Sequence, residues 1–169
     1  MSTRALLISL FKYKAWANEA FFEALKSMDV GQFAHERTTA IRVLNHVYVV
    51  DRIFVAHLQG QAHGYTANNT EATPTLDELL AAVRATDAWY LDYVGSIAPD
   101  DLTQNVEFTF TDGLAGRMSR QEILAHIAAH GANHRGAVGR IMDQTSVTRP
   151  KDIFTAYLHQ AEPERRLRA

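Results

Sequence analysis

Apolar residues recur at every third or fourth position along four long segments of this chain. In the first segment, Leu6, Leu10, Tyr13, Ala17 and Phe21 follow this spacing. The spacing places apolar side chains on one face of an α-helix, which must then be buried against other helices. The sequence therefore predicts four helices, over residues 3–28, 39–59, 75–96 and 119–143.

The segments between these helices indicate where the helices begin and how they are joined. Residues 61–73 contain Gly and Asn, show no periodicity and are long for a helix connection, which is typical of a loop near a functional site. Thr75 with Glu78, and Ser119 with Glu122, have the spacing of capping boxes. These two pairs therefore mark the starts of the third and fourth helices.

A short β element is expected before the fourth helix. Apolar residues from Val106 to Phe110 alternate with polar ones up to Asp112-Gly113, a sequence that favours a tight turn. We therefore predict an all-α four-helix bundle with a short β-hairpin or extended segment before the fourth helix. Three ranges complete the prediction: a short closing helix over 152–160, one bundle domain over 1–160 and a frayed tail over 161–169.

The chain has no cysteine and eight histidines. Disulfides, thiolate zinc sites and cysteine nucleophiles are therefore excluded, and metal chemistry must depend on imidazole. Lys and Arg number 17 against 19 Asp and Glu, and this balance, without a basic stripe, argues against nucleic-acid and anionic membrane partners. Neither a secretory signal nor an apolar run of membrane-spanning length is evident, so we expect a cytoplasmic protein.

Three of the histidines lie on one face of the fourth predicted helix. His126, His130 and His134 are spaced by four, so their rings project from one stripe, about 6 Å apart along the axis. Adjacent rings can share a metal ion, which leaves two candidate pairs that both contain His130. A third ligand must come from another helix, and His46 and His57 are both candidates. Only one of these two can join the pair, because they are about 16 Å apart along the second helix.

Other histidine patterns fit known metal motifs poorly. His35-Glu36 has Thr39 where a zinc-protease helix needs its second histidine, and no Glu-x-x-His pair of a di-iron bundle occurs. Four histidines are interpreted as ordinary structural residues: His35, His57, His63 and His159.

Several motifs along the chain carry a family resemblance. They are Tyr13-Lys-Ala-Trp16-Ala-Asn18-Glu, Leu44-Asn-His46 with Asp51-Arg52-Ile53-Phe54, and His126-Ile-Ala-Ala-His130-Gly-Ala-Asn-His134-Arg135-Gly136. In this order, with the Asp112-Gly113 turn and the Asp152-Ile-Phe-Thr-Ala-Tyr157 ending, they resemble the DinB family of DNA-damage-inducible proteins, which is related to the YfiT-like metalloenzymes. The resemblance implies a metal site with one histidine from the second helix and two from the fourth, which correspond to His46, His130 and His134.

Residues beside the implied ligands are candidates to orient the ligand rings. By position these are Asn18, Asn45, Asn133 and His126, each with a purely structural role as the alternative. For His126 that alternative is packing against the hairpin. Many family members have a second histidine or an aromatic residue where this chain has Asn133. Asp51 and Arg135 are expected to pair structurally.

Three imidazole ligands leave at least one open coordination position, which is typical of a catalytic metal site. Imidazole ligation favours zinc or nickel. The wider superfamily includes thiol-dependent transferases and a mycothiol-dependent isomerase, so the resemblance implies a metal-dependent transferase or hydrolase that acts on a small molecule with an external low-molecular-weight thiol. The alternative is a non-enzymatic metal-stabilised bundle, or a dimeric interaction protein linked to a stress response. A homodimer is expected in either case.

Overall fold

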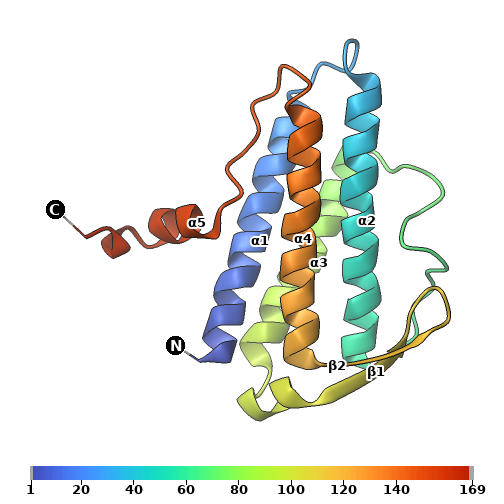
Figure 1. Cartoon of the computed structure of the whole chain (residues 1–169), viewed down its shortest axis with the longest axis vertical. Helices are drawn as coiled ribbons and strands as arrows, with labels where there is room; N and C mark the ends of the chain where they lie inside the picture. Colours follow the sequence, from blue (N-terminus) through green and yellow to red (C-terminus); the bar gives the residue numbers. More distant parts are fainter. Residues whose placement is uncertain (1, 168–169) are drawn as a thin grey trace.

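The computed structural model describes residues 2–167, and its long helices form a bundle (Figure 1). They are α1 (Thr3–Lys26), α2 (Ala34–Gln59), α3 (Leu76–Ser96) and α4 (Arg120–Met142). The prediction of an all-α bundle with a short hairpin before the fourth helix is confirmed.

The loop between α2 and α3 sets the topology of the bundle. It returns along α2, where Asn45 donates to the hydroxyl of Thr70 at 2.6 Å and Arg42 donates to the carbonyl of Thr70 at 2.6 Å. Therefore α3 runs in the same direction as α2, while α4 runs antiparallel to α2 (Figure 1). The length of the loop follows from this return, because the chain must span the bundle before α3 begins.

The helix starts agree with the sequence where a capping box marks them. Thr75 caps α3 and Ser119 caps α4, each with the reciprocal hydrogen bond from the glutamate three residues on. In contrast, α2 begins at Ala34, five residues before the predicted start. Its first turns are polar with no residue buried before Ala40, and its N-cap makes no side-chain hydrogen bond, so neither periodicity nor a cap signal reveals this start.

The predicted hairpin consists of β1 (Asn105–Thr109) and β2 (Ala115–Ser119), which pair antiparallel after the short 3-10 helix η1 (Pro99–Thr103). Gly113 in the turn has a φ of +87°, a conformation that favours glycine. The hairpin lies across the end of the bundle beneath α2 and α4 (Figure 1).

The C-terminal segment leaves the top of α4 and lies beside α1 (Figure 1). The closing helix α5 covers Phe154–Ala161, close to its predicted range, and the 3-10 helix η2 (Pro163–Arg165) follows. Tyr157 of α5 contacts the rings of Tyr13 and Trp16 on α1. The division into a bundle domain and a frayed tail stays a prediction, and residues 168–169 of that tail lie outside the described residues.

The apolar core consists of two clusters, and a buried polar network lies between them. On α1, Phe11 belongs to one cluster and Phe21 to the other, while Lys14 and Asn18 between them are buried polar residues. The same order holds on α4, where buried Arg135 separates the two clusters.

Lys14 is the centre of this network. Its ammonium group lies 2.7 Å from a carboxylate oxygen of Asp51 on α2 and 2.6 Å from one of Asp87 on α3. Burial lowers the pKa of Lys14, but the two carboxylates outweigh this effect and raise the pKa overall, so the ammonium is charged. Three helices are therefore held by one buried cation.

Arg135 joins α4 to the same network. Its guanidinium donates to the side-chain oxygen of Asn18 at 3.1 Å, and Asn18 donates to Asp87 at 2.8 Å. Arg135 also pairs with Asp152 at 2.8 Å, ahead of α5. The predicted pairing of Asp51 with Arg135 is thus wrong, because each has a nearer partner of opposite charge.

No helix within residues 2–167 combines the length and the apolar character that crossing a membrane requires.

The variant Lys14→Met tests the buried network. It leaves the Asp51 and Asp87 carboxylates buried without their cation, and removing one partner of a buried ion pair costs about 3–5 kcal/mol. We expect the free energy of unfolding, measured by urea denaturation, to fall by about that amount. The control Glu19→Gln breaks the exposed pair with Arg84 and should leave it almost unchanged, because solvent screens that pair. Similar small losses in both variants would contradict this role of Lys14.

Candidate metal centre

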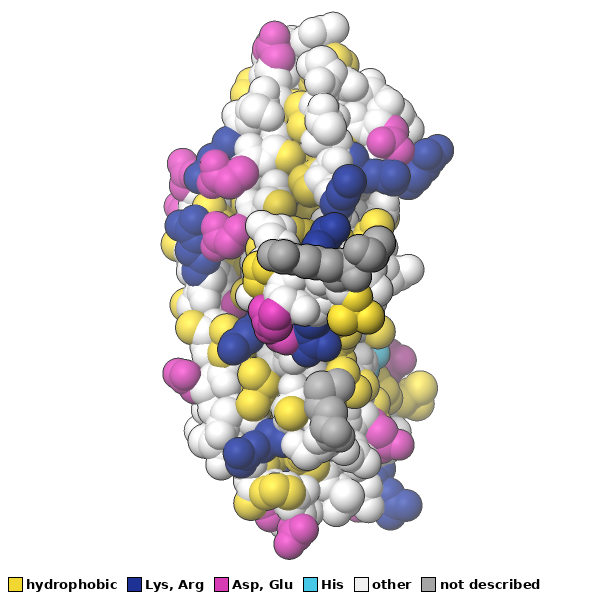
Figure 2. All heavy atoms as spheres, turned by 90° about the vertical axis from the view of Figure 1, so that its left-hand side faces the viewer, with side chains coloured by type: hydrophobic (Ala, Val, Ile, Leu, Met, Phe, Trp, Pro, Cys, Tyr) yellow, Lys and Arg dark blue, Asp and Glu magenta, His cyan; other side chains and the backbone are white. Residues whose placement is uncertain are grey.

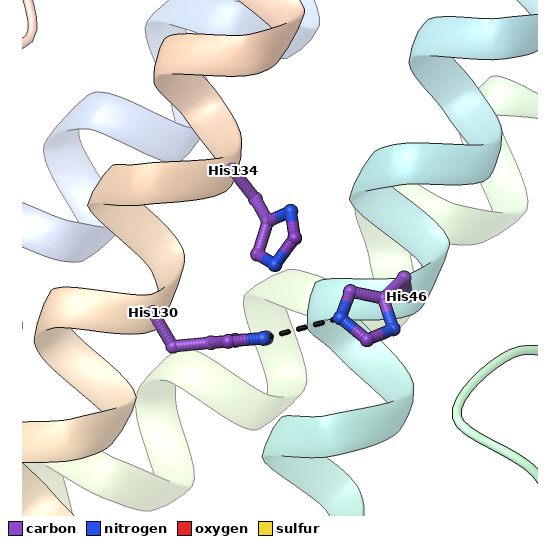
Figure 3. A group of neighbouring side chains, drawn as sticks. All are labelled: His46, His130 and His134. Carbon is purple, nitrogen blue, oxygen red and sulfur yellow. Dashed lines mark hydrogen bonds between the residues drawn. The ribbon is translucent and has the colours of Figure 1, made fainter.

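Three histidines converge between α2 and α4. His46 comes from α2, while His130 and His134 are one turn apart on α4, and the three rings point toward one another (Figure 3). One nitrogen of each ring lies within 4.8 Å of a nitrogen of both other rings. The Nε2 atoms of His46 and His130 are 3.1 Å apart. The geometry thus brings together the three residues to which the family resemblance points.

The buried network determines which face of α4 turns toward α2. Arg135 and Gly131 lie on the side of α4 that faces α1, where a Cβ atom on Gly131 would meet the side chain of Lys14 at 3.5 Å. With that side fixed, the stripe formed by His130 and His134 faces His46 across the gap between α4 and α2. The helix packing therefore positions the histidines.

A backbone contact selects the tautomer of His46. Its Nδ1 lies 2.8 Å from the backbone carbonyl oxygen of Asn68, in the loop between α2 and α3. Because a carbonyl can only accept, Nδ1 carries a proton, and the tautomer of the neutral ring that this contact selects presents its Nε2 lone pair toward the other two rings. Metal-binding histidines typically have such a second hydrogen bond.

Burial keeps the two histidines of α4 neutral. Desolvation, helped by His134 and His46, lowers the pKa of His130 to about 3. Desolvation and the nearby His46 also lower the pKa of His134. Two neutral imidazoles are thus available near pH 7, which is the form that binds metal ions.

The donor set fits one divalent metal ion. Two nitrogens bound to one zinc ion at tetrahedral angles are about 3.4 Å apart, close to the observed separation of His46 and His130. Within the described residues, Nδ1 of His130 is buried without a hydrogen-bond partner. The ring of His130 therefore has its polar contact at Nε2, with Nε2 of His46. A metal ion bound by both nitrogens would replace this contact.

A cavity of about 320 Å³ opens beside this group, and His46 and His130 form part of its wall. The rest of the wall comes from α2, from the hairpin and from the loop between α2 and α3, through residues such as Phe54, Phe108 and Asn68. The hydroxyl of Thr111 after β1 donates to the side-chain oxygen of Asn68 at 2.7 Å. The hairpin and the loop that orients His46 are thus joined at the cavity.

A sequence model of the DinB family matches residues 1–166. The chain belongs to the DinB family. No curated protein and no solved structure matches the chain closely enough to add to this assignment.

The other predicted site residues of this DinB-family chain have different surroundings. Asn18 forms hydrogen bonds with Asp87 and Arg135 in the buried network, and not with a ring of the three-histidine group. Asn133 is exposed on α4. His126 lines the cavity, and its ring centre lies 5.4 Å from those of both His130 and Phe54.

Asn68 is the contact that the sequence did not reveal. The aperiodic loop did indicate a functional neighbourhood, but a backbone carbonyl is present in every residue and leaves no signal of its own. The position of Phe108 over the cavity was equally hidden, because alternation predicts a strand without predicting what the strand covers.

The low pKa of His130 gives a testable pH dependence. In metal-free protein the unfolded chain takes up a proton at this residue near pH 6.5, and the folded chain does so only near pH 3. The free energy of unfolding therefore falls as the pH decreases between these values. We expect His130→Gln to remove this contribution, so its urea midpoint should fall less than that of the wild type between about pH 7 and pH 5.

Comparing the two proteins removes the contribution of groups that titrate in both. One such group is Asp51, whose pKa burial raises to about 6. Its contribution to the free energy of unfolding changes with pH in the direction opposite to that of His130, and it does so in both proteins. The measurement uses chelator-treated protein. Parallel pH profiles for the wild type and His130→Gln would show that burial does not hold His130 neutral.

Proposed function

We propose that His46, His130 and His134 bind one divalent metal ion, zinc or nickel, and that the chain is a metal-dependent enzyme. The observation that carries this proposal is the cavity of about 320 Å³ beside the three rings. A purely structural site needs no such space, whereas a catalytic site needs room for a substrate next to an open coordination position.

A bound ion would lower the pKa of a coordinated water or thiol and so supply a nucleophile near pH 7. The chain's own residues prepare the site for this. Asn68 holds His46 in one tautomer, and burial keeps His130 neutral. Apolar side chains such as Phe54 and Phe108 line the space beside the rings.

The reaction class that we propose is a thiol-dependent transfer or a hydrolysis on a small molecule. A chain without cysteine must take its thiol from outside, and the family resemblance favours a low-molecular-weight thiol. In the transfer, the thiol loses its proton, its sulfur bonds to an electrophilic carbon of the substrate, and the leaving group departs with the bonding electrons.

The second candidate is a metal-stabilised bundle without turnover. It is favoured by the position of the three histidines, because an ion shared by α2 and α4 would stabilise their packing. Such a protein would act through its surface, as a dimeric interaction protein in a stress response. A cytoplasmic location and a homodimeric state stay predictions from the sequence.

The charge distribution argues against a nucleic-acid partner for either candidate. On the face seen from the side of α5, Lys and Arg side chains are interspersed with Asp and Glu side chains (Figure 2). The formal net charge is −2 at pH 7. Nucleic-acid binding requires a concentrated positive surface.

Thiol consumption separates the two candidates. Metal-loaded protein, incubated with a panel of low-molecular-weight thiols and an electrophilic aryl chloride, should consume thiol faster than the uncatalysed reaction. Chelation should abolish this excess rate, and zinc or nickel should restore it, because the proposed nucleophile depends on the ion.

One variant tests the histidine group in this assay, and a second variant is its matched control. We expect His130→Ala to lose the excess rate, whereas His35→Ala, which alters an exposed histidine at the start of α2, should keep it. A lower melting temperature after chelation, without turnover on any thiol or electrophile, would favour the structural candidate and overturn the enzymatic one.

A further inference from the structure

The wall of the cavity is mostly apolar and carries no formal charge. Among the described residues that line it, none is Lys, Arg, Asp or Glu. Aliphatic and aromatic side chains from α2 and the hairpin dominate the wall: Val50, Ile53, Phe54, Phe108 and Phe110. A charged ligand would lose its hydration here without gaining an ionic partner, which is costly. A flat apolar ligand would instead contact aromatic rings.

Polar side chains from several elements also line the wall: His46, His57, Asn68, Thr111, His126 and His130. Of these, His57 lies near the C-terminal end of α2. His46 and His57 are separated by about 16 Å along α2. His57 therefore lies toward the end of the cavity that is remote from His46.

His57 is held in place by packing against aromatic neighbours. The ring stacks on Phe108 at 5.0 Å between ring centres and meets Phe54 edge-on at 5.7 Å. His63 lies beside it at 5.1 Å. Across residues 2–167 no hydrogen bond involves the His57 side chain, and burial and His63 both lower its pKa. A neutral imidazole offers one donor and one acceptor.

We infer that the cavity binds a neutral, flat, largely apolar molecule with one hydrogen-bonding group at the end remote from the three histidines, and that His57 selects this group. The small volume, near the lower limit of ligand pockets, favours a molecule of one or two rings. The inference rests on the proposed function only in assigning this molecule the role of the electrophilic acceptor. The binding preference itself can be measured without turnover.

Three naphthalene probes of similar size test the inference on the wild-type protein: naphthalene, neutral 2-naphthol and anionic 2-naphthoate. Titrations use chelator-treated protein, so that no probe can bind through a metal ion. We expect 2-naphthol to bind about tenfold more tightly than naphthalene, which corresponds to one hydrogen bond in a desolvated site. We expect 2-naphthoate to bind at least tenfold more weakly than 2-naphthol. Equal affinities for the anion and the neutral alcohol would overturn the assignment of a neutral ligand.

The variant His57→Phe tests the role of His57. Phenylalanine keeps the stacking on Phe108 and removes both ring nitrogens, so the affinity for naphthalene should stay the same while the preference for 2-naphthol disappears. The control His35→Phe makes the same substitution at an exposed position and should keep the preference. His57→Gln, which can still form a hydrogen bond, should restore part of it. If the preference survives in His57→Phe, the role of His57 is wrong.

These results can be separated from the fate of the proposed function. A wild-type protein that shows the expected preferences but never consumes thiol would keep the binding site and lose the enzymatic proposal. A protein that consumes thiol but binds all three probes equally would keep the enzymatic proposal and lose the proposed binding preference. The metal content of His57→Phe should match that of the wild type, because His57 does not belong to the three-histidine group.

Discussion

One buried cation determines how the helices of this protein are arranged. Lys14 on α1 lies between Asp51 of α2 and Asp87 of α3, and Asn18 extends the network to Arg135 on α4. Because an unpaired charge in this interior would be very costly, each helix has a narrow range of rotations and translations in which every partner is satisfied. The two apolar clusters on either side supply the burial energy, while the network specifies the register.

The candidate metal centre is a consequence of that register. Arg135 directly follows His134 and lies about 100° from it around the helix, so the contacts that fix Arg135 toward α1 also turn the histidine stripe of α4 toward α2. The loop after α2 then adds the hydrogen bond from His46 to Asn68, and the hairpin closes the space beside the rings. Three converging imidazoles next to an apolar cavity are the arrangement that a metal-dependent enzyme for small molecules requires.

The sequence predicted the features that depend on local pattern. Apolar periodicity predicted the four helices, and the two capping boxes predicted the starts of α3 and α4. Spacing predicted that His130 shares a stripe with His134, but it could not choose between His46 and His57, since that choice depends on how α2 packs against α4. It also gave Asp51 the wrong partner, because residues far apart in sequence carry no local signal of their pairing. The backbone carbonyl of Asn68 was hidden for a similar reason.

Metal analysis of three purified proteins tests the central claim most directly. The wild type, His130→Ala and His126→Ala are each loaded with zinc, dialysed against metal-free buffer and analysed by mass spectrometry of the elements. The variant of His126 is the matched control, because this residue lies one turn away on the same stripe but outside the three-histidine group. The account predicts about one ion per chain in the wild type and in His126→Ala, and none in His130→Ala. Full metal content in His130→Ala would contradict it.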